Sequence, residues 1–94
     1  MAAIGVLTLE LRIDHAQSLK DKRRIVKSLK DRLRRKFNVS VSEIDDQGLH
    51  NSSVIAAVTV SPSRPFAQKI LQSVEREAAD LLGPMLIRTG AEWF

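Results

Sequence analysis

In residues 4–37, "IGVLTLELRIDHAQSLKDKRRIVKSLKDRLRRKF", the spacing of hydrophobic residues changes from a period of two to one of about 3.6, which predicts a strand followed by a helix. Over residues 4–13, leucines alternate with polar residues, which predicts a half-buried strand. Over residues 18–37, apolar side chains recur every three or four positions and fall on one helical face. Ser18 followed by Asp21 resembles a capping box, so we expect the helix to begin there.

The rest of the chain adds two strands, a second helix and a last strand. Residues 38–45 alternate again, and residues 53–61 form the most apolar run, with a loop around Gly48 between them. A second amphipathic helix then ends at Gly83, and residues 85–94 follow as the last strand. The predicted core face of this second helix consists of Phe66, Ile70, Val74, Ala78 and Leu81, with Leu71 and Leu82 at its margin.

The order strand, helix, strand, strand, helix, strand predicts the fold class. It is the split βαβ pattern of ferredoxin-like α+β folds, in which right-handed crossovers place two helices on one face of a four-stranded antiparallel sheet. A length of 94 residues suits one modest core, so we expect a single domain over residues 1–94. The absence of cysteine excludes disulfides and thiolate chemistry.

Positive charge is concentrated in the first predicted helix. Residues 18–37 contain ten Lys or Arg and two Asp, whereas the whole chain has a net charge of only +4. Such a face suits the phosphate backbone of a nucleic acid, because each neutralised phosphate releases counterions. Lys22 falls inside the apolar arc, where it either extends outward to solvent or meets an acid or a bound anion. The predicted phosphate contacts are Lys20, Arg23, Arg24, Lys27, Lys30, Arg34 and Arg35.

Three stretches of the sequence resemble a known family. Residues 5–13 ("GVLTLELRI"), residues 18–45 and residues 52–61 ("SSVIAAVTVS") are similar to the YlxP-like family of small bacterial proteins of unassigned function. The resemblance spans residues 4–61 and implies a ferredoxin-like fold and a cytoplasmic protein, often encoded beside translation and ribosome-maturation factors. It brings no established catalytic residues.

The aromatic residues argue against sequence-specific reading of RNA. The chain has no Tyr, and we expect Phe37 and Phe66 on helix core faces and Trp93 and Phe94 in core or interface packing. Domains of this topology that read single-stranded RNA stack bases on sheet aromatics. We therefore expect a binding module for structured RNA or ribosomal components that contacts the backbone and tolerates changes of sequence.

Signals of catalysis are weak. Asp45, Asp46 and His50 flank a loop, but acids and a His near a Gly are typical of a solvated turn rather than a metal site. There is no Gly-rich phosphate loop, nucleophile elbow or zinc signature. The sequence therefore predicts no enzyme, no catalytic residue, no metal and no cofactor.

The alternative is a homo-oligomeric protein-interaction module whose basic helix meets an acidic partner. A four-stranded open sheet has two edges and one face without helices, so a homodimer through an edge or that face is expected. No apolar run approaches the length of a membrane span, and residues 1–14 lack the features of a secretory signal, so we expect a cytoplasmic protein without membrane contact. The predicted open-face residues are Val6, Thr8, Ser40, Ser42, Ile55 and Ala57.

Overall fold

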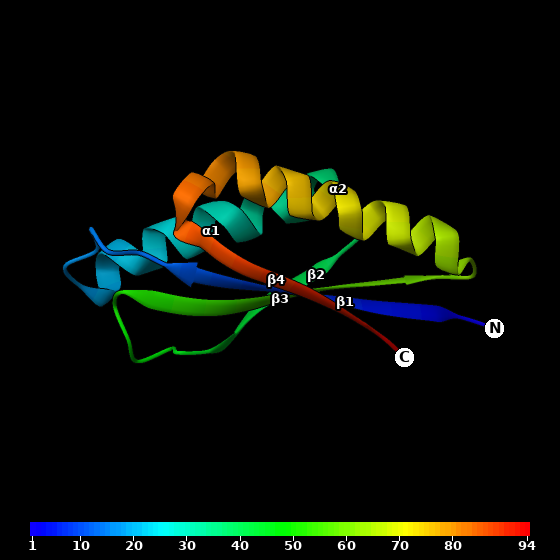
Figure 1. Ribbon diagram of the computed structural model, residues 1–94, viewed down its shortest axis with the longest axis horizontal. Helices are drawn as coiled ribbons and strands as arrows, with labels where there is room; N and C mark the ends of the chain where they lie inside the picture. The colour runs from blue at the N-terminus through cyan, green and yellow to red at the C-terminus, as the bar shows by residue number, and fades with distance from the viewer.

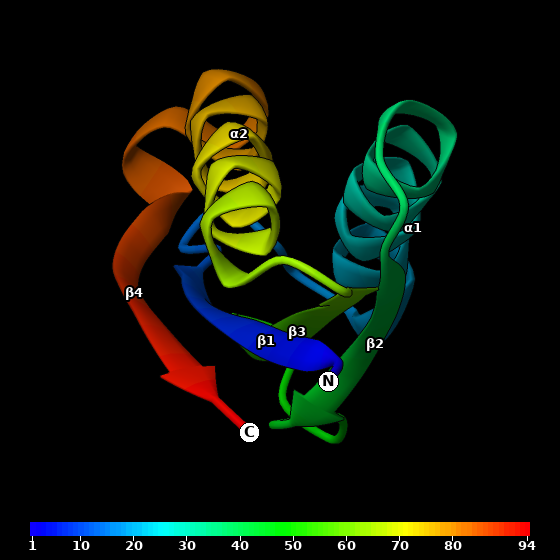
Figure 2. The same ribbon diagram turned by 90° about the vertical axis from the view of Figure 1, so that its right-hand side faces the viewer.

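The computed structural model describes residues 1–94 and confirms the predicted ferredoxin-like fold. The four strands form one antiparallel sheet in the order β2-β3-β1-β4. Both helices lie on the same side of this sheet (Figures 1 and 2), and the other side carries no helix. The elements are β1 (Ala3–Arg12), α1 (Leu19–Lys36), β2 (Ser40–Asp45), β3 (Ser52–Ser61), α2 (Arg64–Leu82), a short 3-10 turn (Gly83–Met85) and β4 (Leu86–Trp93).

Helix α1 begins and ends where the sequence predicts. The Ser18 side chain accepts a hydrogen bond from the backbone N–H of Asp21 at 3.1 Å, and the Asp21 carboxylate accepts one from Gln17. The Asp21 N–H is one of the backbone donors that the first turn of a helix leaves without a partner. Leu29 and Leu33 are fully buried against the sheet, so most of the charged residues of the helix face outward.

The core lies between the helices and one face of the sheet. Leu7 and Leu9 of β1 pair directly with Ala57 and Ile55 of β3, and all four side chains are buried. Directly paired residues of antiparallel strands share a face, so Ile55 and Ala57 face the helices with the β1 leucines. The prediction of Ile55 and Ala57 on the open face is therefore wrong, because the register with β1 places Val54, Val58 and Val60 of β3 on that face instead.

The buried face of helix α2 is turned from the predicted one by less than one position, because Val74 and Ala78 are buried as predicted and so are the marginal Leu71 and Leu82. Its buried residues are Ala67, Leu71, Val74, Ala78 and Leu82, whereas Phe66 is 59% exposed. Phe66 lies in the first turn, where its backbone N–H donates to the Ser63 cap, and the small Ala67 faces the sheet. The prediction of Phe66 on the core face is therefore wrong, since the apolar arc begins one residue later.

On the edge strand β4, the side chain of Trp93 packs over a glycine of β1. Trp93 pairs with Gly5 of β1, and a Cβ at Gly5 would lie 2.7 Å from the indole ring. The guanidinium of Arg64 lies over the Trp93 ring, 4.8 Å from its centroid. The predicted packing role of Trp93 is confirmed, because its side chain contacts the core cluster.

Candidate functional site

Four of the seven predicted phosphate contacts form one row on α1. Arg23, Lys27, Lys30 and Arg34 follow each other at steps of four, three and four residues, which places them on the flank that faces β2. Over this row the helix rises by roughly 16 Å. Lys20 lies on the outer ridge of the helix, Arg24 adjoins α2, and Arg35 lies beside Asp31 and Arg34.

A groove of about 560 Å³ runs between this flank of α1 and strand β2. β2 is an edge strand, so the groove is open on the side away from β3. The wall contains a single apolar residue, and basic side chains supply most of it. The lining residues are Lys22, Arg23, Val26, Lys27, Lys30, Asp31, Arg34 and Glu43.

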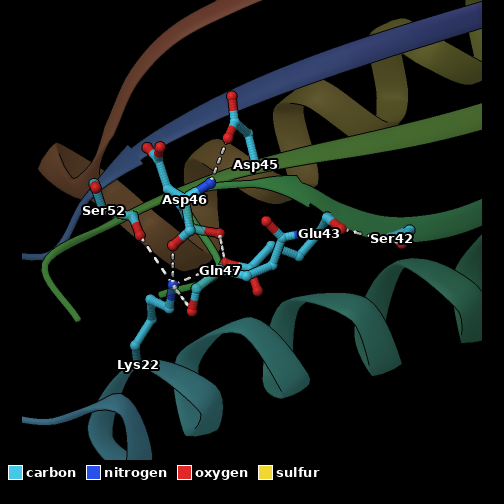
Figure 3. Close-up of polar contacts among 8 residues, drawn as sticks. Lys22, Ser42, Glu43, Asp45, Asp46, Gln47 and Ser52 are labelled. Atoms are coloured by element: carbon cyan, nitrogen blue, oxygen red, sulfur yellow. Dashed lines mark hydrogen bonds and ion pairs between the residues drawn. The ribbon is translucent and has the colours of Figure 1, made fainter. Parts of the chain in front are cut away.

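Lys22 lies at the buried end of this groove and does not reach solvent. Its side chain is 1% exposed, and its Nζ lies 2.9 Å from Oε2 of Glu43 (Figure 3). The same ammonium donates to the backbone carbonyls of Asp46 at 2.7 Å, Ser52 at 3.2 Å and Gln47 at 3.4 Å. Of the two expected positions for Lys22, the extended one is therefore wrong, and the contact with an acid is confirmed.

Glu43 is held from both sides. Besides the ion pair with Lys22, its Oε2 accepts a 2.6 Å hydrogen bond from the hydroxyl of Ser53. A buried carboxylate without partners is costly, and here the ammonium and the hydroxyl both satisfy it. Because Lys22 neutralises Glu43, the floor of the groove presents no unpaired negative charge to a ligand.

The basic side chains of the groove differ in whether they already form an ion pair or a hydrogen bond within the chain. Lys27 pairs with Asp31 at 2.7 Å, and its hydrogen bond lowers the pKa of the Asp31 carboxyl below the ordinary value of 3.8. Arg34 donates a 2.8 Å hydrogen bond to the carbonyl of Val41 in β2. Arg23 and Lys30 have no ion-pair or hydrogen-bond partner in the chain, so their full donor capacity faces the groove.

The opposite flank of α1 is partly neutralised. Arg32 and Lys36 both contact the carboxylate of Glu77 in α2, at 3.3 and 3.0 Å. The hydrogen bond from Lys36 lowers the pKa of Glu77 below its ordinary 4.5, more strongly than partial desolvation raises it. Positive charge without a protein counter-ion therefore gathers on the outer ridge and the β2 flank.

Two other kinds of site receive no support from the geometry. The chain brings no three His, Asp or Glu side chains together as a set of metal ligands, and Asp45, Asp46 and His50 lie around an exposed turn. Neither helix is long and apolar enough to cross a membrane. A smaller hollow of about 200 Å³ between α1 and α2 is mainly apolar and adjoins Arg24.

Glu43 is a groove residue that was not predicted from the sequence. The sequence contained a signal for it, because Glu43 lies two positions after Val41 in β2 and so points to the same, helix-facing side. Lys22 in the apolar arc of α1 was the second half of that signal. A lysine and a glutamate at two core-facing positions indicate a buried ion pair, which then fixes where β2 lies beside the helix.

A family model described as "Protein of unknown function (DUF503)" matches residues 4–87. The chain is also 41% identical over 71 residues to a Bacillus subtilis protein described as "Uncharacterized protein YlxP", covering 76% of this chain and 77% of that protein. The match extends past residue 61 into α2 and the start of β4. The resemblance noted in the sequence is confirmed over a longer stretch.

Solved structures of similar fold include designed and natural proteins. The de novo designed protein Foldit4 covers the whole chain with a TM-score of 0.62 at 9% identity, over 97% of its own length. A second designed protein, described as having a ferredoxin fold, covers the whole chain at 14% identity and a TM-score of 0.55, over 84% of its length. A dimeric ferredoxin-like protein of unknown function from Thermobifida fusca covers 97% at 18% identity and a TM-score of 0.51, over 90% of its length. These likenesses show the fold.

Proposed function

The chain belongs to DUF503, a family of proteins of unknown function, and we propose that it is a non-catalytic, cytoplasmic module that binds structured RNA or a ribosomal surface. Binding takes place in the groove between α1 and β2, through the phosphate backbone. The single observation that carries this proposal is the row Arg23, Lys27, Lys30 and Arg34, whose charges line one continuous groove.

The free cations of the row support an anionic polymer rather than a small anion. Arg23 and Lys30 have no protein partner, and they lie about 10 Å apart along the helix axis by its rise per residue. That separation is too long for one phosphate to bridge but suits a chain that carries a charge on every unit. Lys20 on the neighbouring outer ridge extends the same positive surface toward the start of α1.

The lining of the groove favours backbone contacts over base reading. Its one apolar residue is Val26, and it holds no aromatic side chain on which a base could stack. Contacts to phosphate position a nucleic acid without carrying sequence information. Binding is therefore expected to depend strongly on salt and weakly on sequence.

The proposal is tested by fluorescence anisotropy of a labelled RNA hairpin over a series of salt concentrations. If four to six phosphates are met, the logarithm of the association constant falls against the logarithm of salt with a slope of roughly −3 to −5. Hairpins with the same stem length and permuted sequence should compete almost equally. Absence of binding at low salt, or binding that salt leaves unchanged, would overturn the proposal.

A second candidate function is a homo-oligomeric module whose basic groove holds an acidic protein partner. The observation that favours it is the apolar sheet face opposite the helices, together with the Thermobifida fusca neighbour, which is described as dimeric. The same assay separates the two candidates. A labelled acidic peptide that binds in low salt where the hairpin does not would favour the protein partner.

A further inference from the structure

The sheet face without helices carries a continuous apolar patch on its two central strands and at the end of β4. Ile4 pairs with Val60, and Val6 pairs with Val58, so these four side chains lie side by side. Phe94 exchanges two backbone hydrogen bonds with Ile4 and therefore projects to the same side. Val60 is 56% exposed, Ile4 38% and Phe94 73%. We call these five residues the open-face patch.

The charges around the open-face patch are few and nearly cancel. The register places Glu10, Arg12, Asp45, Arg88 and Glu92 on the same face, as three acids and two bases. Glu10 and Arg88 also approach each other to 3.5 Å. This face therefore offers no field to an RNA or to a strongly acidic protein, in contrast to the flank of α1.

We propose that the open-face patch is covered by the same patch of a second copy of this chain, in a two-fold symmetric dimer. A two-fold interface requires a surface that complements itself, and an apolar patch with a nearly neutral rim meets that requirement. A strongly acidic or strongly basic partner would leave some charged groups, either of the rim or of the partner, without a counter-charge.

The area of the face is sufficient for such a dimer. β1 and β3 pair over ten residues, from Ala3 with Ser61 to Arg12 with Ser52. With about 3.4 Å per residue and about 4.8 Å between strands, the four-stranded face measures roughly 600 Å² per copy. Two copies would therefore bury about 1,200 Å², which lies at the lower end of stable protein interfaces.

The sheet edges are poorer surfaces for pairing. On β2, the carbonyl of Val41 already accepts a hydrogen bond from Arg34, which lies across that edge. On β4, the pairing register shifts opposite Glu10 and Leu11, and charged Arg88 and Glu92 lie along the strand. Irregular pairing and charged side chains are features that protect edge strands from adding another strand.

The dimer would place its two grooves on opposite outer surfaces. Figure 2 shows both helices above the sheet, so a copy bound below it leaves each α1 turned away from the interface. If the groove binds RNA, which rests on the proposed function, the dimer holds either two RNA segments or two sites of one RNA. Binding at two sites of one RNA would raise the overall affinity, because the second contact forms at a high effective concentration. The dimerisation itself does not depend on that function.

Sedimentation equilibrium without RNA tests the inference. The chain should pass from monomer to dimer mass as its concentration rises, and the Val60→Lys variant should weaken the association at least about tenfold, because it buries one added charge from each copy. The matched control is Leu49→Lys, which places the same charge at a residue of similar exposure, 51%, in the loop between β2 and β3. This control should dimerise as the wild type does.

Phe94→Asp provides a second variant at the chain end, where a charge is compatible with folding even if Val60→Lys is not. Circular dichroism establishes which variants are folded. A wild type that stays monomeric at every concentration, folded patch variants that dimerise like wild type, or a dimer that dissociates in high salt would overturn the inference. RNA binding with its salt slope retained by a monomeric Val60→Lys variant would show that the groove functions independently.

Discussion

Lys22 Nζ lies 2.9 Å from Oε2 of Glu43, and this ion pair joins α1 to the edge strand β2 at the floor of the groove. The ammonium also holds three carbonyls from residues 46, 47 and 52, so it fixes both ends of the loop between β2 and β3 (Figure 3). One buried lysine therefore sets the shape of the groove and removes the negative charge of Glu43 from it. The outer cations Arg23 and Lys30 remain available because Glu43 is already neutralised.

Replacing Lys22→Met should destabilise the chain by about 2–3 kcal/mol. Met fills the space, but Glu43, which is 19% exposed, loses its counter-ion, and the loop carbonyls lose their donor. Urea unfolding followed by circular dichroism measures the change. The double variant Lys22→Met with Glu43→Leu should lose less unfolding free energy than the two single variants lose together, because the unpaired carboxylate is gone. Strictly additive costs would contradict a coupled pair.

Replacing Gly5→Ala should destabilise the sheet by about 1–3 kcal/mol. The new Cβ would lie 2.7 Å from the Trp93 ring and 2.8 Å from Leu71, so the packed ring must move. The same change at Gly90, where a Cβ meets nothing within 4 Å, is the control and should cost far less. Equal unfolding free energies for the two alanine variants would show that Trp93 does not pack on Gly5 in solution.

Glu77 should make stability depend on pH in the acid range. Its pKa is lower in the folded chain than its ordinary 4.5, chiefly through the hydrogen bond from Lys36. The unfolded chain therefore takes up the proton first as pH falls, so the stabilisation is full above about pH 4.5 and is lost as pH drops through the folded pKa. Glu77→Gln should lower the unfolding free energy more at about pH 6 than at about pH 3.

The partners of Glu77 supply the check on this prediction. Removing both of them, with Arg32→Gln and Lys36→Gln, takes away the contacts that lower the Glu77 pKa. In that background Glu77→Gln should have a small effect that no longer changes between the two pH values. A difference that persists would place the cause of the pH dependence elsewhere.

The fold could be predicted from the sequence because the spacing of hydrophobic residues indicates the type of each element and local residues mark its ends. Leu7, Leu9 and Leu11 occupy every second position of β1, as in a strand with one buried face. Ser18 marks the start of α1 through a cap that depends on local residues alone. Such signals involve residues within a few positions of each other. Periodicity therefore predicted the order of elements, and the order left one topology for a sheet of four strands.

The errors concern contacts between elements far apart in the sequence. Ile55 and Ala57 resemble open-face residues until the register with β1 is known, and Phe66 resembles a core residue until the rotation of α2 is known. The same holds for the site. The basic residues of α1 were evident, but their division into a groove row and a flank held by Glu77 depends on which neighbour each side of the helix meets.

The central claim is that the β2 flank of α1, and not net charge alone, binds RNA. Its most direct test compares two charge-matched variants by hairpin anisotropy in a salt series. The groove variant changes Arg23, Lys27 and Lys30 to Gln and keeps Arg34, whose hydrogen bond to Val41 holds the edge strand. The control changes three exposed basic residues elsewhere, Arg12, Lys69 and Arg76, to Gln and so removes the same charge.

The groove variant should lose at least about tenfold in affinity at low salt and about two to three units of salt slope, whereas the control should keep nearly all of both. Equal losses in the two variants would contradict the central claim, because binding would then follow the net charge of the chain and not the groove between α1 and β2.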